Sequence, residues 1–236
     1  MTTPWTRRGF LGVAGAAALS SSSVAADTAP AGGKVKILAI SGSMRKGKST
    51  AAGLKACLEA AQAVSPKIDV ELLELAGLHI DPTVALGIAL PPGQADDFLP
   101  LASKLTDPQV WGIIIGTPVY FGSMSSLCKA FLERWVAFKK EYPFSNKVGG
   151  VLAVGGARNG GQELTILGVQ AALMAQEMLI VGDGRPTSHR GATLWNNAKS
   201  DISADEWGLT TAKDLGRRVA EVALRMAAAH GLGDRL

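Results

Sequence analysis

A cluster of hydroxyl and basic residues follows the first apolar run of the chain. Residues 42–50 read Gly-Ser-Met-Arg-Lys-Gly-Lys-Ser-Thr, directly after the apolar run Val35–Ile40 and before an Ala/Leu-rich segment. A strand ending there would deliver this loop to a helix N-terminus, where unpaired N–H groups and the helix dipole favour a phosphate dianion. The side chains expected to hold that phosphate are Ser43, Arg45, Lys46, Ser49 and Thr50.

The spacing of this loop allows two interpretations. Gly42, Gly47, Lys48 and Ser49 fit the G-x-x-x-x-G-K-S loop of nucleoside-triphosphate hydrolases. A hydrolase also needs a carboxylate at the end of a neighbouring strand to hold Mg²⁺. The apolar runs 110–115 and 147–154 continue into glycine and threonine, and neither ends in Asp or Glu. The hydrolase is therefore the weaker alternative, and a mononucleotide phosphate is the stronger one.

Two further unusual loops follow predicted buried strands. Residues 116–126 read Gly-Thr-Pro-Val-Tyr-Phe-Gly-Ser-Met-Ser-Ser, and residues 155–163 read Gly-Gly-Ala-Arg-Asn-Gly-Gly-Gln-Glu. A flat, hydrogen-bonding ring such as a flavin needs backbone amides at its polar edge and an aromatic or apolar wall. The residues predicted to orient such a ring are Pro118, Val119, Tyr120, Phe121, Gly122 and Ser123; those predicted to tune its potential are Gly156, Arg158 and Asn159. We find no acid–base triad and no metal-ligand spacing, so no catalytic side chain and no metal ligand is predicted.

Strand and helix patterns alternate along the chain, which predicts an α/β fold with a doubly wound parallel sheet. Five strands in the order 2-1-3-4-5 are the simple solution for a domain of this size, and ligands then bind at the carboxyl ends of the first and third strands. In that order the first and last helices share one face of the sheet. The expected strands are 34–40, 68–73, 110–115, 147–154 and 179–181; the expected helices are 50–64, 95–105, 125–139, 162–178 and 203–229, the last with a capping box at Ser203–Glu206.

The two cysteines of the chain, Cys57 and Cys128, have no C-x-x-C partners. This pattern predicts neither a zinc site nor an iron–sulfur cluster. Both cysteines lie in predicted helices that belong to opposite faces of the sheet. They are therefore expected to be buried and unpaired.

The N-terminal residues resemble an export signal. Arg7-Arg8 precede a Gly/Ala-rich apolar run and Val24-Ala25-Ala26, which is the order of a twin-arginine signal peptide with a small-residue cleavage site. We therefore expect a signal at 1–26, a linker at 27–33, a single domain at 34–236, and export to the periplasm. Removing the signal lowers the formal net charge from +4 to +2, which gives no indication of nucleic-acid binding. No later stretch is apolar enough to predict stable membrane insertion.

Three motifs in order carry a resemblance to a known family. They are G-S-x-R-K-x-x-S-T, then G-T-P-V-Y-F-G-S-M-S-S-x-x-K-A-F-L-E-R, then G-G-x-R-N-G-G-Q-E. Together they resemble the NAD(P)H-dependent FMN reductase group of flavodoxin-like proteins, in particular its iron–sulfur-flavoprotein-like branch, although this chain lacks that branch's clustered cysteines.

The resemblance implies a flavodoxin-like fold, FMN as cofactor and an oxidoreductase. Electrons would come from NAD(P)H or another donor and pass to a small-molecule acceptor: a quinone, a flavin, a dye-like compound or a metal ion. The family forms homodimers or homotetramers, so the same is expected here. A non-catalytic electron carrier of the flavodoxin type stays open as the alternative, and a phosphate-loop ATPase is the less favoured third.

Overall fold

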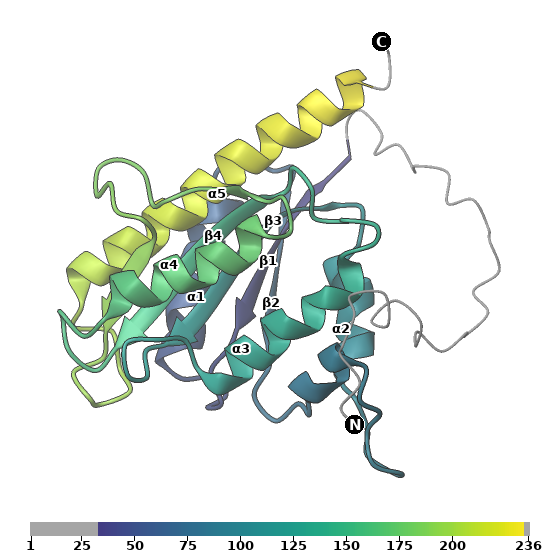
Figure 1. Cartoon of the computed structure of the whole chain (residues 1–236). Coiled ribbons are helices and arrows are strands. Elements are labelled where there is room, and N and C mark those ends of the chain that lie inside the picture. The colour runs from purple at the N-terminus through teal and green to yellow at the C-terminus, as the bar shows by residue number, and fades with distance from the viewer. Residues whose placement is uncertain (1–32, 234–236) are drawn as a thin grey trace, which may run out of the picture.

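The computed structural model describes residues 33–233 as a parallel sheet with helices on both faces (Figure 1). The predicted signal, most of the predicted linker and the last three residues lie outside the described residues. Strands follow the order β2-β1-β3-β4-β5, with β6 also paired to β4, so the predicted order is confirmed. The strands are β1 (Val35–Ser41), β2 (Ile68–Glu74), β3 (Val110–Pro118), β4 (Val148–Gly155), β5 (Leu179–Ile180) and β6 (Ala192–Trp195).

The predicted fifth strand, 179–181, is present in the structure as Leu179–Ile180, and a further strand, β6, follows it. Only Leu179–Ile180 pair with the first half of β4, and Ala192–Trp195 pair in parallel with its second half. The chain therefore leaves the sheet edge after β5 and returns to it at β6. No strand was predicted at 192–195, because four residues between Gly191 and Asn196 are too few to show a strand period.

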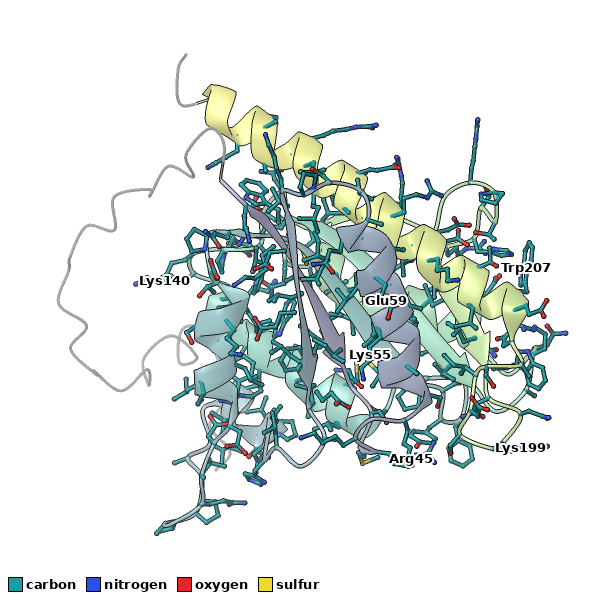
Figure 2. All side chains as sticks on the ribbon, turned by 180° about the vertical axis from the view of Figure 1, so that it is seen from behind. Arg45, Lys55, Glu59, Lys140, Lys199 and Trp207 are labelled. Atoms are coloured by element: carbon teal, nitrogen blue, oxygen red, sulfur yellow. The ribbon has the colours of Figure 1, made fainter. Side chains whose placement is uncertain are left out.

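The helices form two layers. They are α1 (Ser49–Gln62), α2 (Phe98–Leu105), α3 (Ser126–Glu133), α4 (Gln162–Met174) and α5 (Glu206–Gly233), with short 3₁₀ turns η2 (Pro82–Leu86) and η3 (Arg134–Phe138). In Figure 1 the helices α2, α3 and α4 lie in front of the sheet, and Figure 2, drawn from behind, brings α1 and α5 to the front. The predicted division of helices between the two faces is confirmed.

Each layer packs its own apolar core against the sheet, whose central strands β3 and β4 are buried on both faces. Cys57 lies in the core under α1 and α5, and Cys128 lies in the core under α2–α4; both are free and fully buried, as predicted. Gly216 lets α5 approach α1 closely, since a Cβ at this position would lie 1.9 Å from the carbonyl oxygen of Cys57.

Several expected helix boundaries differ from the structure. The predicted helix 95–105 begins at Phe98, and the predicted helix 162–178 ends at Met174. The predicted helix 125–139 is α-helical only to Glu133 and continues as the 3₁₀ turn η3. The predicted capping box at Ser203 is wrong: Asp205 caps α5, accepting a hydrogen bond from the Gly208 amide at 2.9 Å. Ser203 instead donates its amide hydrogen to Asp201 at 2.9 Å in a local turn.

Among the described residues, no helix is both long and apolar enough to cross a bilayer.

Candidate functional site: a flavin-type rim

Three loops meet at the carboxyl ends of β1, β3 and β4. These strands are neighbours in the sheet, with β3 between the other two. The Gly42 amide donates to the Gly116 carbonyl at 2.7 Å, and the Val119 amide donates to the Val154 carbonyl at 2.9 Å. Ser125 Oγ donates to the Gly42 carbonyl at 2.5 Å. Backbone and side-chain bonds therefore join the three predicted loops into one rim.

The first loop presents an uncapped helix N-terminus. No side-chain hydrogen bond caps α1 at Lys48, and its first turn contains no acidic residue. The first N–H groups of the helix and its dipole are thus left without an anionic partner. A phosphate group would accept hydrogen bonds from these N–H groups and carry the negative charge that the dipole favours. The residues present therefore fit the phosphate of FMN.

The predicted phosphate ligands divide into a buried and an exposed set. The hydroxyl residues Ser43, Ser49 and Thr50 are almost fully buried at the base of the loop, whereas Arg45 and Lys46 are exposed above it. The amide of Arg45 donates to Ser43 Oγ at 3.1 Å, which fixes the start of the turn. The hydroxyls are therefore positioned by the fold, and the basic side chains lie above them at the surface.

The segment after β6 folds against the phosphate loop. Arg45 Nη1 donates to Ser200 Oγ at 2.6 Å, and Asn196 Nδ2 donates to Ser49 Oγ at 3.2 Å. In Figure 2, Arg45 and Lys199 lie along the same edge of the molecule. Asn196 and Ser200 are site residues that were not predicted, because the polar, Gly/Asn-rich composition of 182–202 was their only signal in the sequence.

A carboxylate also contacts the loop. The Gly47 amide, at a φ of 67°, donates to Glu74 Oε2 at 2.7 Å. Glu74 is the last residue of β2, which is the strand on the far side of β1 from β3. The predicted second strand, 68–73, ends one residue before Glu74, and Glu74 was not predicted as a site residue.

The second loop places two aromatic residues in solvent. Tyr120 and Ser123 exchange backbone hydrogen bonds of 2.9 and 3.0 Å across a two-residue turn. Phe121 and Gly122 form that turn at φ values of 49° and 73°. Tyr120 is 44% exposed and Phe121 is fully exposed. A flavin ring resting on this turn would cover apolar surface that folding leaves bare.

The side chain of Gln162 organises the third loop. It is buried, accepts from the Gly160 amide at 2.8 Å, and donates to the carbonyls of Ala157 at 2.7 Å and Leu194 at 3.1 Å. Gly156 is open to solvent, with no heavy atom within 4 Å of a Cβ built there. The loop is rigid on the side of the sheet, and its exposed backbone is available to a ligand.

Arg158 is paired with a buried acid. Its guanidinium forms an ion pair with Asp205, whose side chain is 1% exposed, and its carbon Cζ lies 5.7 Å from the ring centre of Trp195. Arg158 Nη1 also donates to the Thr193 carbonyl at 3.4 Å. The structure therefore fixes Arg158 at the outer edge of β6 with 40% of its side chain exposed. Its predicted role in tuning a flavin stays a prediction.

Neither a reactive thiol nor a metal-ligand cluster is found at the rim among the described residues. Cys128 lies directly beneath the first loop, because a Cβ on Gly42 would come within 2.6 Å of the Cβ of Cys128. Burial raises the pKa of the Cys128 thiol to about 12, so this sulfur is protonated and inert at neutral pH. Within residues 33–233, no group of three or more His, Cys, Asp or Glu side chains could hold a metal ion.

The fold and this rim define a flavodoxin-like α/β protein. Residues 35–193 match the model of the NADPH-dependent FMN reductase family, and the chain belongs to that family. The family assignment confirms the resemblance seen in the three motifs, makes the chain an oxidoreductase, and identifies FMN as its cofactor.

Individual relatives agree with this assignment. An iron–sulfur flavoprotein of Methanocaldococcus jannaschii is 36% identical over 192 residues, covering 80% of this chain and 97% of that protein. An NAD(P)H dehydrogenase (quinone) of Archaeoglobus fulgidus is 35% identical over 115 residues, covering 48% of this chain and 60% of that protein. Among solved structures, a flavodoxin, WrbA-like protein from Agrobacterium tumefaciens aligns with a TM-score of 0.54 at 18% identity, covering 81% of this chain and 98% of that chain, which supports the fold.

The iron–sulfur part of the first relative's name does not transfer to this chain. A cluster is held by four cysteine ligands in most such proteins. This chain has two cysteines, and they lie in separate cores on opposite faces of the sheet.

Proposed function

We propose that this chain is an exported, FMN-dependent reductase that takes electrons from NAD(P)H or another donor and passes them to a quinone, a flavin, a dye-like compound or a metal ion. The observation that carries the proposal is the uncapped N-terminus of α1 at a rim shared by three loops. The names of two quinone-reducing relatives, one from Archaeoglobus fulgidus and one from Paracoccus denitrificans, support a quinone as acceptor.

Bound FMN would supply the two-electron redox chemistry between donor and acceptor. In our proposal, this chain's residues bind and orient the cofactor. Ser43, Ser49 and Thr50 donate hydrogen bonds to the phosphate, and Arg45 and Lys46 neutralise its charge. The turn at Tyr120–Ser123 supports the ring, and the Gly156 backbone contacts its polar edge.

A first experiment tests the cofactor and the catalysis together. The purified protein should be yellow, and denaturation should release FMN. The FMN-loaded protein should then oxidise NADH or NADPH in the presence of a soluble quinone. A loaded protein that undergoes reversible photoreduction but shows no turnover would be the electron carrier instead. A colourless protein that hydrolyses ATP with Mg²⁺ would contradict both.

We further propose export through the twin-arginine route, on the strength of Arg7-Arg8 and the run that follows. Replacing both arginines by lysine should leave the protein in the cytoplasmic fraction of its host, whereas the wild type should reach the periplasm. Equal distribution of the two proteins would contradict the proposal.

Assembly into a homodimer or homotetramer is also proposed. The outward face of α4 supports it, because Leu167 and Met174 are exposed on that helix. Sedimentation of the FMN-loaded protein should give a particle of two or four chains. A monomer at micromolar concentration would contradict this.

A further inference from the structure

A cavity of about 340 Å³ lies at the outer edge of the sheet, behind the third loop. It is bounded by the N-terminal turn of α4, by β6, by the excursion between β5 and β6, and by the first turn of α5. Its walls include Arg158, Asn159, Leu164, His189, Thr193 and Trp207. Its volume falls in the range of small-molecule sites.

Aromatic and apolar groups line one side of this cavity. Trp207 is 53% exposed, and Figure 2 shows it projecting outward from the N-terminal end of α5. The His189 ring meets the Trp207 ring edge-on, with 6.1 Å between ring centres and 85° between planes. Leu164 adds a side chain that is 65% exposed. A flat ring lying against Trp207 would cover apolar surface on two sides.

The polar groups of the cavity are mainly hydrogen-bond donors that are already held in position. The guanidinium of Arg158 donates hydrogen bonds to Asp205 and to the Thr193 carbonyl. A guanidinium has five N–H groups, so the remaining ones are available to a ligand. The His189 ring is held in place by the contact of its Nδ1 with the buried carboxylate of Asp183 at 3.2 Å, and it forms part of the aromatic wall. The α4 N-terminus has no side-chain cap. These groups select a ligand that carries acceptor oxygens.

The acids near the cavity are occupied. The carboxylates of Asp183 and Asp205 are buried and engaged with backbone amides, His189 and Arg158. Glu163 pairs with Arg190 at 3.0 Å. An acidic ligand would therefore meet paired carboxylates and positioned donors.

From the aromatic wall and the surplus of donors, we propose that this cavity binds a planar aromatic carboxylate at a site separate from that of FMN. The ring lies against Trp207 and Leu164, and the carboxylate accepts from the remaining N–H groups of Arg158 and from the first amides of α4. Because Arg158 and Asn159 also belong to the loop predicted to contact the flavin, the two ligands would share this loop as a wall.

Calorimetric titration of 2-naphthoate into the FMN-loaded full chain tests this site directly. We expect saturable binding with one molecule per chain, and naphthalene-2-carboxamide, its neutral analogue, should bind more weakly. Trp207→Ala should weaken 2-naphthoate binding about tenfold through the loss of the aromatic contact. Leu86→Ala is the matched control, since Leu86 is 69% exposed on η2 and lies outside the cavity, and it should leave binding unchanged.

Four results would overturn the inference. They are no binding of 2-naphthoate, an affinity that Trp207→Ala does not change, equal affinity for the carboxamide, and release of FMN in proportion to bound 2-naphthoate. The last result would assign the cavity to the flavin site. Since cofactor retention is measured in the same titration, failure of this site is distinguished from failure of the FMN assignment.

Discussion

The hydroxyl of Ser125 bonds two of the three loops at the rim. It donates to the Gly42 carbonyl at 2.5 Å and accepts from the Cys128 amide at 3.0 Å, so one buried side chain caps α3 and holds the first loop. This relationship makes the position of α3 a determinant of the phosphate site. It also explains how residues 83 positions apart act together.

Ser125→Ala should therefore loosen both features. We expect the free energy of unfolding to fall by about 1–2 kcal/mol, because an N-cap bond is lost and a buried carbonyl loses its donor. FMN affinity should fall as well. Urea denaturation and FMN titration measure the two effects, and Ser126→Ala, at the exposed neighbouring position, is the control. Unchanged stability would contradict the role assigned to this hydroxyl.

Arg45→Ala should weaken FMN binding by about 1.5–3 kcal/mol, the usual value of a charge-assisted hydrogen bond. Quenching of flavin fluorescence on binding gives the affinity. Lys140→Ala removes the same charge from an exposed position well away from Arg45 in Figure 2, and it should have no effect. Equal affinities for wild type and Arg45→Ala would place the phosphate elsewhere.

Glu74→Gln should strengthen FMN binding. The amide oxygen of Gln can still accept from the Gly47 amide, while the negative charge beside the phosphate is removed. We expect a gain of about 0.5–1 kcal/mol at low ionic strength, and the gain should shrink as salt is added. Titrations at two salt concentrations check this, and weaker binding of FMN to the variant would contradict it.

Phe121→Asn separates backbone strain from ligand contact. Phe121 has a φ of 49°, which disfavours a bulky residue, and Asn tolerates this region better. The free energy of unfolding of the variant should be about 1 kcal/mol higher than that of the wild type. The variant should nevertheless bind FMN more weakly, because the exposed aromatic ring is lost. Tyr142→Asn, at a φ of 47° outside the rim, should gain stability without changing FMN affinity. Equal FMN affinity in both variants would remove Phe121 from the site.

The stability of the protein should depend on pH through Lys147. Burial lowers the pKa of this amine from 10.5 to about 8, so the native state resists its charge. Below about pH 8 the Lys147 amine is protonated in both the native and the unfolded protein, and the native state carries the full cost of burying its charge. Between about pH 8 and 10.5 the unfolded chain holds more protons, so stability rises with pH.

Lys147→Met should remove this cost. The variant should be more stable than wild type at pH 7 by at most about 3 kcal/mol, and the difference should narrow as pH rises from 8 to 10.5. Chemical denaturation of both proteins across this range provides the measurement. A difference in unfolding free energy that stays constant with pH would contradict the account.

Much of the fold follows from local patterns. The runs that form β3 and β4 are continuous and apolar, the run that forms β1 is apolar except at Lys36, and loops with glycine follow all three, so sheet order and rim could be predicted together. The 3₁₀ turn at Arg134–Phe138 could not, because its residues have the same apolar spacing as a helix. The strand β6 is held by long-range bonds, such as that from the Trp195 amide to Asp205 at 2.8 Å, and these leave no local signal.

Site residues that belong to a sequence motif could be predicted. Site residues that reach the loop from distant parts of the chain could not. Ser43, Ser49 and Thr50 come from one motif, and the structure buries all three at the loop. Glu74 and Asn196 reach the same loop from β2 and from the segment after β6, and only the three-dimensional register brings them there. Arg158 was predicted from its motif, but its partner Asp205 lies 47 residues away.

The most direct measurement compares FMN with riboflavin, which has the same ring and lacks the phosphate. If the uncapped N-terminus of α1 holds the phosphate, the apo-protein should bind FMN at least about 100-fold more tightly than riboflavin, since several charge-assisted hydrogen bonds are lost together. The Arg45→Ala variant should narrow that ratio. Equal affinity of the wild-type protein for the two compounds would contradict the proposed site.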